Sequence, residues 1–79
     1  MMPQSNIRVR FANNLRRLRR ERRLTQDAMA SLADMDRTYV SCLENCCSAA
    51  SLDMVAKIAA VLGVDPVVLL ERRPAPPRK

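Results

Sequence analysis

The segment that most constrains the fold of this chain is 24–44, LTQDAMASLADMDRTYVSCLE. Its first half has a good N-cap residue, Thr25, followed by a short run whose apolar positions recur at helical spacing. A second run of the same kind follows Asp36, another residue that favours the N-cap position. Only a few residues separate the two runs, so the connection must be a tight turn. The segment therefore predicts two short helices, 26–33 and 37–44, joined as a helix-turn-helix.

The second of these helices has an apolar inner face and a polar outer face. The outward positions are Arg37, Thr38, Ser41 and Cys42. A helix of this kind can lie in the major groove of DNA and read base edges with its N-terminal residues. Arg37 can donate to guanine O6 and N7 together, and Thr38 can bond a base edge or touch a thymine methyl group. Arg37 is the only basic residue of this helix, so most base-specific hydrogen bonding is expected from it.

Three further helices are expected on either side of this segment. A helix over 7–22 is indicated by a single apolar stripe formed by Phe11, Leu15 and Leu18. A helix over 52–62 is expected to end at Gly63, the only glycine of the chain. Asp65 followed by Pro66 is a helix start signal and predicts a short helix over 66–70. The sequence thus predicts an all-α, five-helix bundle.

Length and composition allow one domain. We expect it to span 7–71 with its helix-turn-helix core at 25–44, between a flexible arm at 1–6 and a disordered basic tail at 72–79. No stretch is long and apolar enough for a membrane span or a signal core, so a cytoplasmic, nucleoid-associated protein is expected. A domain this small leaves no room for an effector-binding unit, and no small-molecule effector is expected.

Positive charge is concentrated at the two ends of the chain. Residues 1–23 hold eight arginines and one glutamate, whereas 24–71 carry a net charge of −5 and the tail adds +4. A basic face suits a polyanion, most simply duplex DNA, although a solvated basic helix would look the same. The phosphate-binding candidates from the first helix are Arg10, Arg16 and Arg23.

Catalysis and metal binding are poorly supported. The chain has no histidine and one glycine, and its acids are scattered, so neither an enzyme nor a cofactor is expected. The three cysteines, Cys42, Cys46 and Cys47, should be reduced thiols in the cytosol. Without histidine they cannot close a zinc site within one chain. A thiol sensor is the alternative, because Cys42 would face the groove.

The residues of 24–44 resemble the helix-turn-helix of Cro and the phage repressors, the XRE family. The run DRTYVS resembles the recognition helix of restriction–modification controller proteins, and the resemblance spans about 9–70. It implies a lambda-repressor-like DNA-binding domain. It also implies a homodimer whose recognition helices lie about 34 Å apart on a palindromic operator. Arg23 and Asp34 depart from the family, which usually has glycine at both positions.

The resemblance also assigns roles to individual residues. Gln26 would bond the DNA backbone and brace the recognition helix, Arg19 would pair with Glu44, and Tyr39 would either reach a phosphate or pack half-buried. Together with the candidates drawn from the residues alone, the expected DNA-binding set is Thr25, Gln26, Arg37, Thr38, Tyr39, Ser41, Cys42 and Asn45. The dimer interface is expected near Pro66, Val67 and Val68, which could instead only complete the monomer core.

These features predict a sequence-specific, double-stranded-DNA-binding transcriptional regulator that acts as a homodimer. A controller of a restriction–modification operon is the favoured subtype, with a phage-type repressor or an antitoxin as alternatives. A protein-interaction module with the same fold but no DNA binding is the competing class. The net negative charge of 24–71 is the feature that favours it.

Overall fold

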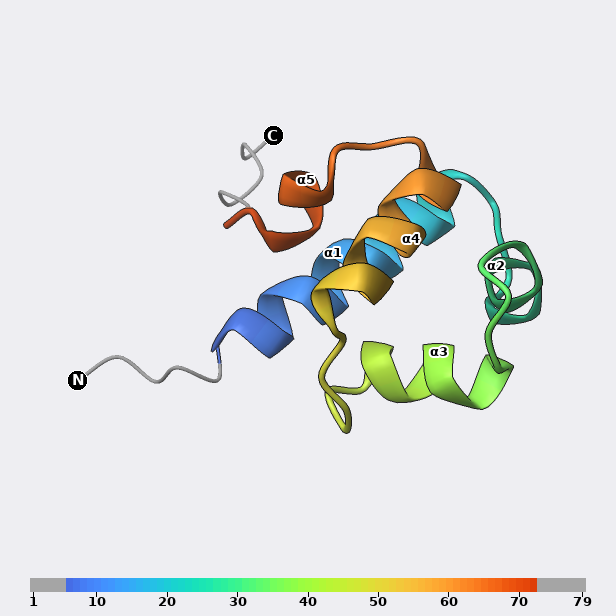
Figure 1. Cartoon of the computed structure of the whole chain (residues 1–79), viewed down its shortest axis with the longest axis horizontal. Coiled ribbons are helices and arrows are strands. Elements are labelled where there is room, and N and C mark those ends of the chain that lie inside the picture. Colours follow the sequence, from blue (N-terminus) through green and yellow to red (C-terminus); the bar gives the residue numbers. More distant parts are fainter. Residues whose placement is uncertain (1–5, 73–79) are drawn as a thin grey trace, which may run out of the picture.

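The computed structural model of the chain describes residues 6–72, which form five helices with no strand among them (Figure 1). The helices are α1 (Asn6–Glu21), α2 (Gln26–Leu32), α3 (Arg37–Glu44), α4 (Leu52–Leu62) and α5 (Pro66–Leu70). The predicted all-α architecture is confirmed, and each predicted helix boundary lies within one residue of the observed one. Asn6, expected in the arm, is the first residue of α1. The rest of the arm, and the tail from 73 onward, lie outside the described residues.

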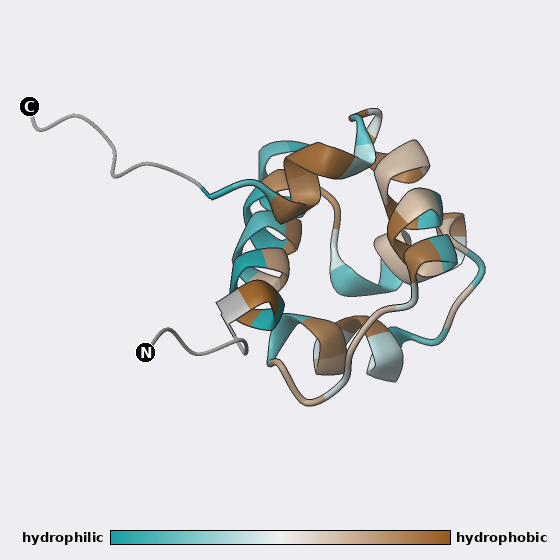
Figure 2. Cartoon of the chain, turned by 60° about the vertical axis from the view of Figure 1, so that its left-hand side comes forward, coloured by the Kyte–Doolittle hydropathy of each residue, from teal (hydrophilic) through white to brown (hydrophobic). Residues whose placement is uncertain are grey.

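One apolar core joins all five helices. Each helix supplies at least one large side chain that is fully buried, and these are Leu15, Met29, Val40, Leu43, Ile58 and Leu69. Burying a side chain of this size stabilises the fold by about 1.5–3 kcal/mol. α1 packs against α3 and α5, while its hydrophilic residues lie along its outer side (Figure 2). None of the helices within 6–72 is both long and apolar enough to cross a bilayer.

Side-chain caps begin three of the helices. Thr25 Oγ1 accepts a hydrogen bond from the Ala28 amide, and Ser51 Oγ accepts one from Met54. Asp65 likewise caps α5 through the Val67 amide at 3.0 Å. Such a cap contributes about 1 kcal/mol. The cap expected at Asp36 has the backbone conformation of an N-cap but lacks the side-chain hydrogen bond.

Four helices end in the same kind of turn, in which the chain passes through one left-handed residue. These residues are Arg23, Asp34, Cys46 and Gly63, with φ between 56° and 72°. The following amide then donates back to a carbonyl five residues earlier, as Met35 does to Ala30 at 2.9 Å. This closure satisfies carbonyls that the helix leaves free. Only one of the four positions is glycine, so the other three carry a backbone cost.

A buried amide closes the first helix onto the last. Asn14 is 2% exposed, and its Nδ2 donates to the carbonyls of Leu69 at 2.8 Å and Glu71 at 2.9 Å. Each of these bonds spans more than 50 residues of sequence. A polar side chain inside an apolar face is costly unless its hydrogen bonds are made. Asn14 therefore fixes where α5 docks on α1.

Candidate nucleic-acid interface

α2 and α3 form the predicted helix-turn-helix, in which α2 packs against α3 and α3 also packs against α1. Ala30 and Ala33 are both buried in the core. Because their side chains are small, they leave room for the two short helices to approach each other closely. The turn between them passes through Asp34, which tolerates a positive φ better than most residues. The second helix is thus presented on a rigid support, with its first turn away from the core.

Arg37 and Thr38 occupy that first turn, and both are exposed. The Arg37 side chain is 66% exposed, and its Nε lies 3.5 Å from Oδ1 of Asp27, which is 77% exposed. An ion pair this exposed contributes little, from near zero to about 1 kcal/mol. The guanidinium is therefore easily released to another acceptor. Sequence reasoning missed Asp27, although an acid in the first turn of α2 was a readable signal.

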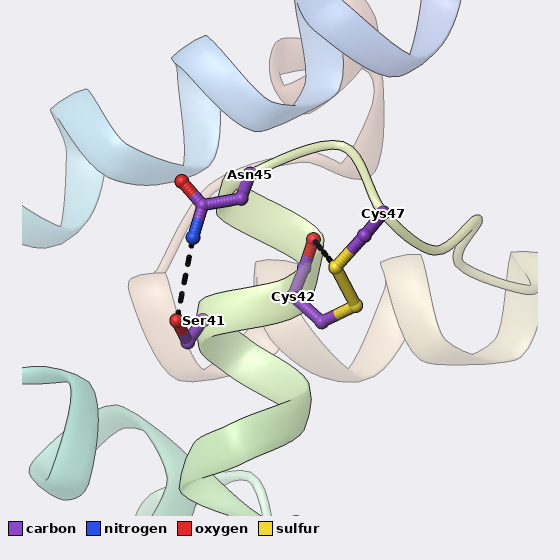
Figure 3. The surroundings of a disulfide bond; sticks show 4 residues. All are labelled: Ser41, Cys42, Asn45 and Cys47. Atoms are coloured by element: carbon purple, nitrogen blue, oxygen red, sulfur yellow. Dashed lines mark hydrogen bonds between the residues drawn. A yellow bond between two sulfur atoms is a disulfide. The ribbon is translucent and has the colours of Figure 1, made fainter.

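The rest of the predicted face is less open than expected. Asn45 Nδ2 donates to Ser41 Oγ at 3.4 Å, so these two candidates form one polar pair at the end of α3 (Figure 3). Tyr39 is half-buried and packs against the core, which matches the packing alternative for this residue. Thr25 exposes its side chain but uses Oγ1 as the cap of α2.

The prediction of three reduced thiols differs from the structure. Cys42 and Cys47 form a disulfide (Figure 3), which leaves Cys46 as the free cysteine. The left-handed turn at Cys46 explains the pairing, since it brings the Cα atoms of Cys42 and Cys47 to 5.2 Å. That distance lies within the usual range for a disulfide. Cys42 is therefore half-buried and bonded, and it is not the free groove-facing thiol that was expected.

Glu44 is the centre of a buried polar cluster behind the recognition helix. Its side chain is 2% exposed. Arg19 donates two hydrogen bonds to its carboxylate, from Nε to Oε2 at 2.6 Å and from Nη2 to Oε1 at 3.0 Å. Gln26 Nε2 donates to the same carboxylate at 3.1 Å. The cluster ties α1, the start of α2 and the end of α3 together. Gln26 thus braces the recognition helix through its last residue.

The cluster also sets the protonation of Glu44. Burial by itself would raise the pKa of this carboxyl. The hydrogen bonds from Arg19 and Gln26, with the charges of Arg19 and Arg16, more than offset the effect of burial, so the pKa lies below its ordinary value. Glu44 is therefore ionised at neutral pH, as its partners require.

Two arginines of α1, and Arg22 just after it, bind backbone carbonyls at the ends of other helices. Arg16 Nη2 donates to the Glu44 carbonyl that ends α3, at 2.6 Å. Arg22 Nε donates to the Leu62 carbonyl that ends α4, at 2.6 Å. Arg10 Nη1 reaches the Leu70 carbonyl that ends α5, at 3.4 Å. A cation at a helix C-terminus satisfies free carbonyls and complements the helix dipole.

The three arginines proposed for phosphate binding differ in whether their side chains bond to the rest of the fold. Arg10 and Arg16 are engaged in the fold, whereas Arg23 is exposed beside the start of α2. Within the described residues, Arg23 makes no side-chain hydrogen bond or ion pair. Arg23 is three residues before the first residue of α2. Its guanidinium and the free amides at the start of α2 can therefore contact the same anion.

The α5 residues predicted for the dimer interface differ in burial. Pro66 and Val67 are exposed, and Val67 retains 57% of its accessible surface, whereas Val68 is half-buried against the core. Val68 thus contacts the monomer core with part of its side chain and leaves the rest accessible. Pro66 and Val67 remain as apolar residues that face outward.

The fold and this site together define a class of protein. Residues 10–72 match the helix-turn-helix domain family, and the chain belongs to this family of DNA-binding transcription regulators. The sequence resemblance to XRE-type proteins is confirmed. The family match covers the helix-turn-helix, α4, α5 and most of α1.

Several of the individual proteins to which the chain is similar are control proteins. C.MunI, a control protein from a Mycoplasma species, is 43% identical over 61 residues, which are 76% of this chain and 82% of that protein. The restriction–modification controller protein C.AhdI from Aeromonas hydrophila has a TM-score of 0.76 at 35% identity, covering 78% of this chain and 94% of that one. The hypothetical transcription factor NHTF from Neisseria has a TM-score of 0.81 at 33% identity, covering 90% and 83%.

Proposed function

We propose that this chain controls a restriction–modification operon by binding a palindromic operator as a homodimer. The observation that carries the proposal is the exposed first turn of α3, where Arg37 and Thr38 stand on a recognition helix braced by the Glu44 cluster. In this proposal Arg37 reads guanine, and Thr38 reads a neighbouring base edge. The similarity to C.MunI and C.AhdI supports the controller assignment.

Phosphate contacts would hold this helix in register. The start of α2 and the exposed Arg23 are the candidates on one side, and the Ser41–Asn45 pair is the candidate on the other. The rest of the affinity would come from a second copy of the chain. The outward-facing Pro66 and Val67 would lie at the symmetric interface.

A mobility-shift assay on the DNA upstream of the chain's own coding sequence tests the proposal. We expect a footprint with two related half-sites and an affinity that falls steeply with salt, with a logarithmic slope of about −0.9 per phosphate contact. Sedimentation of the free protein should report a dimer that Val67→Asp disrupts. A protein that binds no DNA at low salt, or that occupies a single half-site as a monomer, would contradict the proposal.

A protein-interaction module is the second candidate, and a specific contact favours it. The only cation of the recognition helix already has an acidic neighbour, Asp27, and 24–71 carries a net negative charge. A face of this kind could receive a basic protein surface instead of DNA. The same assay separates the two functions, because an interaction module would not bind duplex DNA at any salt concentration.

A further inference from the structure

We propose that Cys42 and Cys47 are a reversible thiol–disulfide site through which an oxidant strengthens operator binding. The proposal rests on the DNA-binding function above and adds its regulation. The pair lies at the end of the recognition helix, with Cys42 in the last turn of α3 and Cys47 in the loop that follows (Figure 3). Oxidation therefore changes the element that would lie in the groove.

The turn places the two sulfur atoms together whether or not they are bonded. The Cys47 amide donates to the Cys42 carbonyl at 3.0 Å, and the Cys46 amide donates to Leu43 at 3.3 Å. The same pair of bonds closes the ends of α2 and α4, where no cysteine is present. The backbone alone therefore holds the residues at positions 42 and 47 side by side. Reduction need not separate the thiols.

The reduced state also has a hydrogen-bond partner ready. Cys47 Sγ lies 3.3 Å from the Cys42 carbonyl oxygen, a contact that becomes an S–H···O hydrogen bond when the sulfur carries its proton. The cysteine pair can thus exist in two states with nearly the same backbone. A site of this kind can cycle without unfolding the domain.

The chemistry requires a hydroperoxide as the oxidant. Cys47 is exposed and Cys42 half-buried, so the Cys47 thiolate meets the oxidant first. It attacks one peroxide oxygen, the O–O bond breaks, and a sulfenic acid and one water or alcohol form. The Cys42 thiolate then attacks the Cys47 sulfur, the S–O bond breaks, and a second water leaves. Two thiols lose two electrons and the peroxide gains them, and a dithiol reverses the step by exchange.

Closure of the disulfide would act on DNA binding through the last turn of α3. The turn passes through Cys46 with φ of 64°, a conformation that costs a non-glycine residue free energy. The disulfide ties this strained turn to the helix. Without it, the turn that follows Glu44 is closed by two backbone hydrogen bonds alone, from the Cys46 and Cys47 amides, and opens more readily. Asn45, which begins this turn, is then held less firmly against Ser41. DNA binding must supply the ordering of Asn45 that oxidation provides in advance.

The test compares the oxidised and reduced full-length chain. After treatment with hydrogen peroxide, thiol titration should count one free thiol, and after dithiothreitol it should count three. Reduction should lower the melting temperature by about 10 °C, as expected for loss of a short cross-link in a domain this small. It should also weaken binding to the upstream DNA by about threefold to tenfold, measured by fluorescence anisotropy.

Two variants serve as controls. Cys46→Ser should keep the whole response, because Cys46 is outside the pair. In Cys42→Ser/Cys47→Ser, the affinity should be the same with peroxide and with dithiothreitol, and circular dichroism verifies that this variant is folded. Three free thiols after peroxide, a disulfide-linked dimer on a non-reducing gel, or equal affinity of the two states would overturn the proposal. If neither state binds DNA while the thiol count still changes, the operator-binding function fails and the coupling fails with it.

Discussion

The first helix and the recognition helix use arginine in opposite ways. α1 and the residues next to it hold eight arginines, and Arg10, Arg16, Arg19 and Arg22 donate to carbonyls or to a buried carboxylate of the fold. α3 has one arginine, Arg37, which is two-thirds exposed and has only an exposed acid nearby. The basic helix therefore holds the other helices in place. The helix with almost no positive charge is the one free to read DNA.

The number of basic residues on a helix therefore does not measure the affinity of that helix for a polyanion. A guanidinium that caps a helix end has part of its hydrogen-bonding capacity and its orientation fixed by the fold, although its charge still adds to the surrounding potential. Substitutions can therefore separate the two uses. Changes behind the recognition helix should affect stability, whereas changes on its outer face should affect binding.

The largest effect is expected from Glu44→Gln, which removes the charge that three α1 and α2 side chains share. Breaking a buried pair from one side costs about 3–5 kcal/mol. Glu21→Gln is the matched control. The Glu21 carboxylate is more than half exposed, and each of its pairs, with Arg17 and Arg22, contributes at most about 1 kcal/mol. Urea unfolding followed by circular dichroism measures both. Similar losses for the two variants would show that the Glu44 cluster is not what braces α3.

Arg37→Ala should weaken operator binding by about 10- to 100-fold, the effect of losing one good bidentate base contact. Its melting temperature should not change, since the side chain is exposed. Arg22→Ala is the reverse control. It should lower stability by about 1 kcal/mol through loss of its bond to the end of α4, and it should lower the affinity only slightly, through the loss of one positive charge. The comparison between α1 and α3 breaks down if Arg22→Ala costs as much affinity as Arg37→Ala.

Acid should weaken the fold through Glu44. Because its pKa is lowered in the folded state, its contribution is complete above the unfolded pKa of about 4.3. The contribution is lost as the pH falls through the folded value. Thermal unfolding from pH 7 to pH 2 should therefore show the wild type and Glu44→Gln converging in acid. Profiles that stay parallel over this range would assign the acid sensitivity to other carboxyl groups.

Asp34→Gly should stabilise the turn between α2 and α3. A non-glycine residue with φ near 56° carries a cost of about 1 kcal/mol, so the melting temperature should rise by about 4–8 °C. Gly63→Ala is the opposite control, and it should destabilise by a similar amount through φ alone, because a Cβ there would meet nothing within 4 Å. No gain from Asp34→Gly would mean that the aspartate adapts to this turn without strain.

Asp27→Asn should give the smallest change, a gain in operator affinity of up to about threefold. The substitution removes the acid that competes for Arg37 while keeping the size of the side chain. Competition anisotropy at low salt measures a change of this size, and the gain should disappear in the Arg37→Ala background. An equal gain in that background would show that Asp27 acts only through net charge.

Sequence reasoning recovered the features that depend on local spacing. Helix bounds, the caps at Thr25 and Asp65 and the left-handed end at Gly63 are all set by residues within one turn of each other. The arginine partners could not be read in this way, since Arg22 and Leu62 are 40 residues apart. The disulfide was missed because nothing in the run NCCSAA signals a left-handed turn at Cys46. Long-range partners and non-glycine turns require the assembled fold.

The bonds from Asn14 to the last helix have a consequence for how the domain is made. α1 is synthesised first, yet the carbonyls that satisfy its buried amide belong to Leu69 and Glu71. Contacts of such high sequence separation must wait for the whole segment between them. On the ribosome, the first four helices would therefore emerge with α1 still incompletely packed. The native domain should appear in one cooperative step after α5 leaves the exit tunnel.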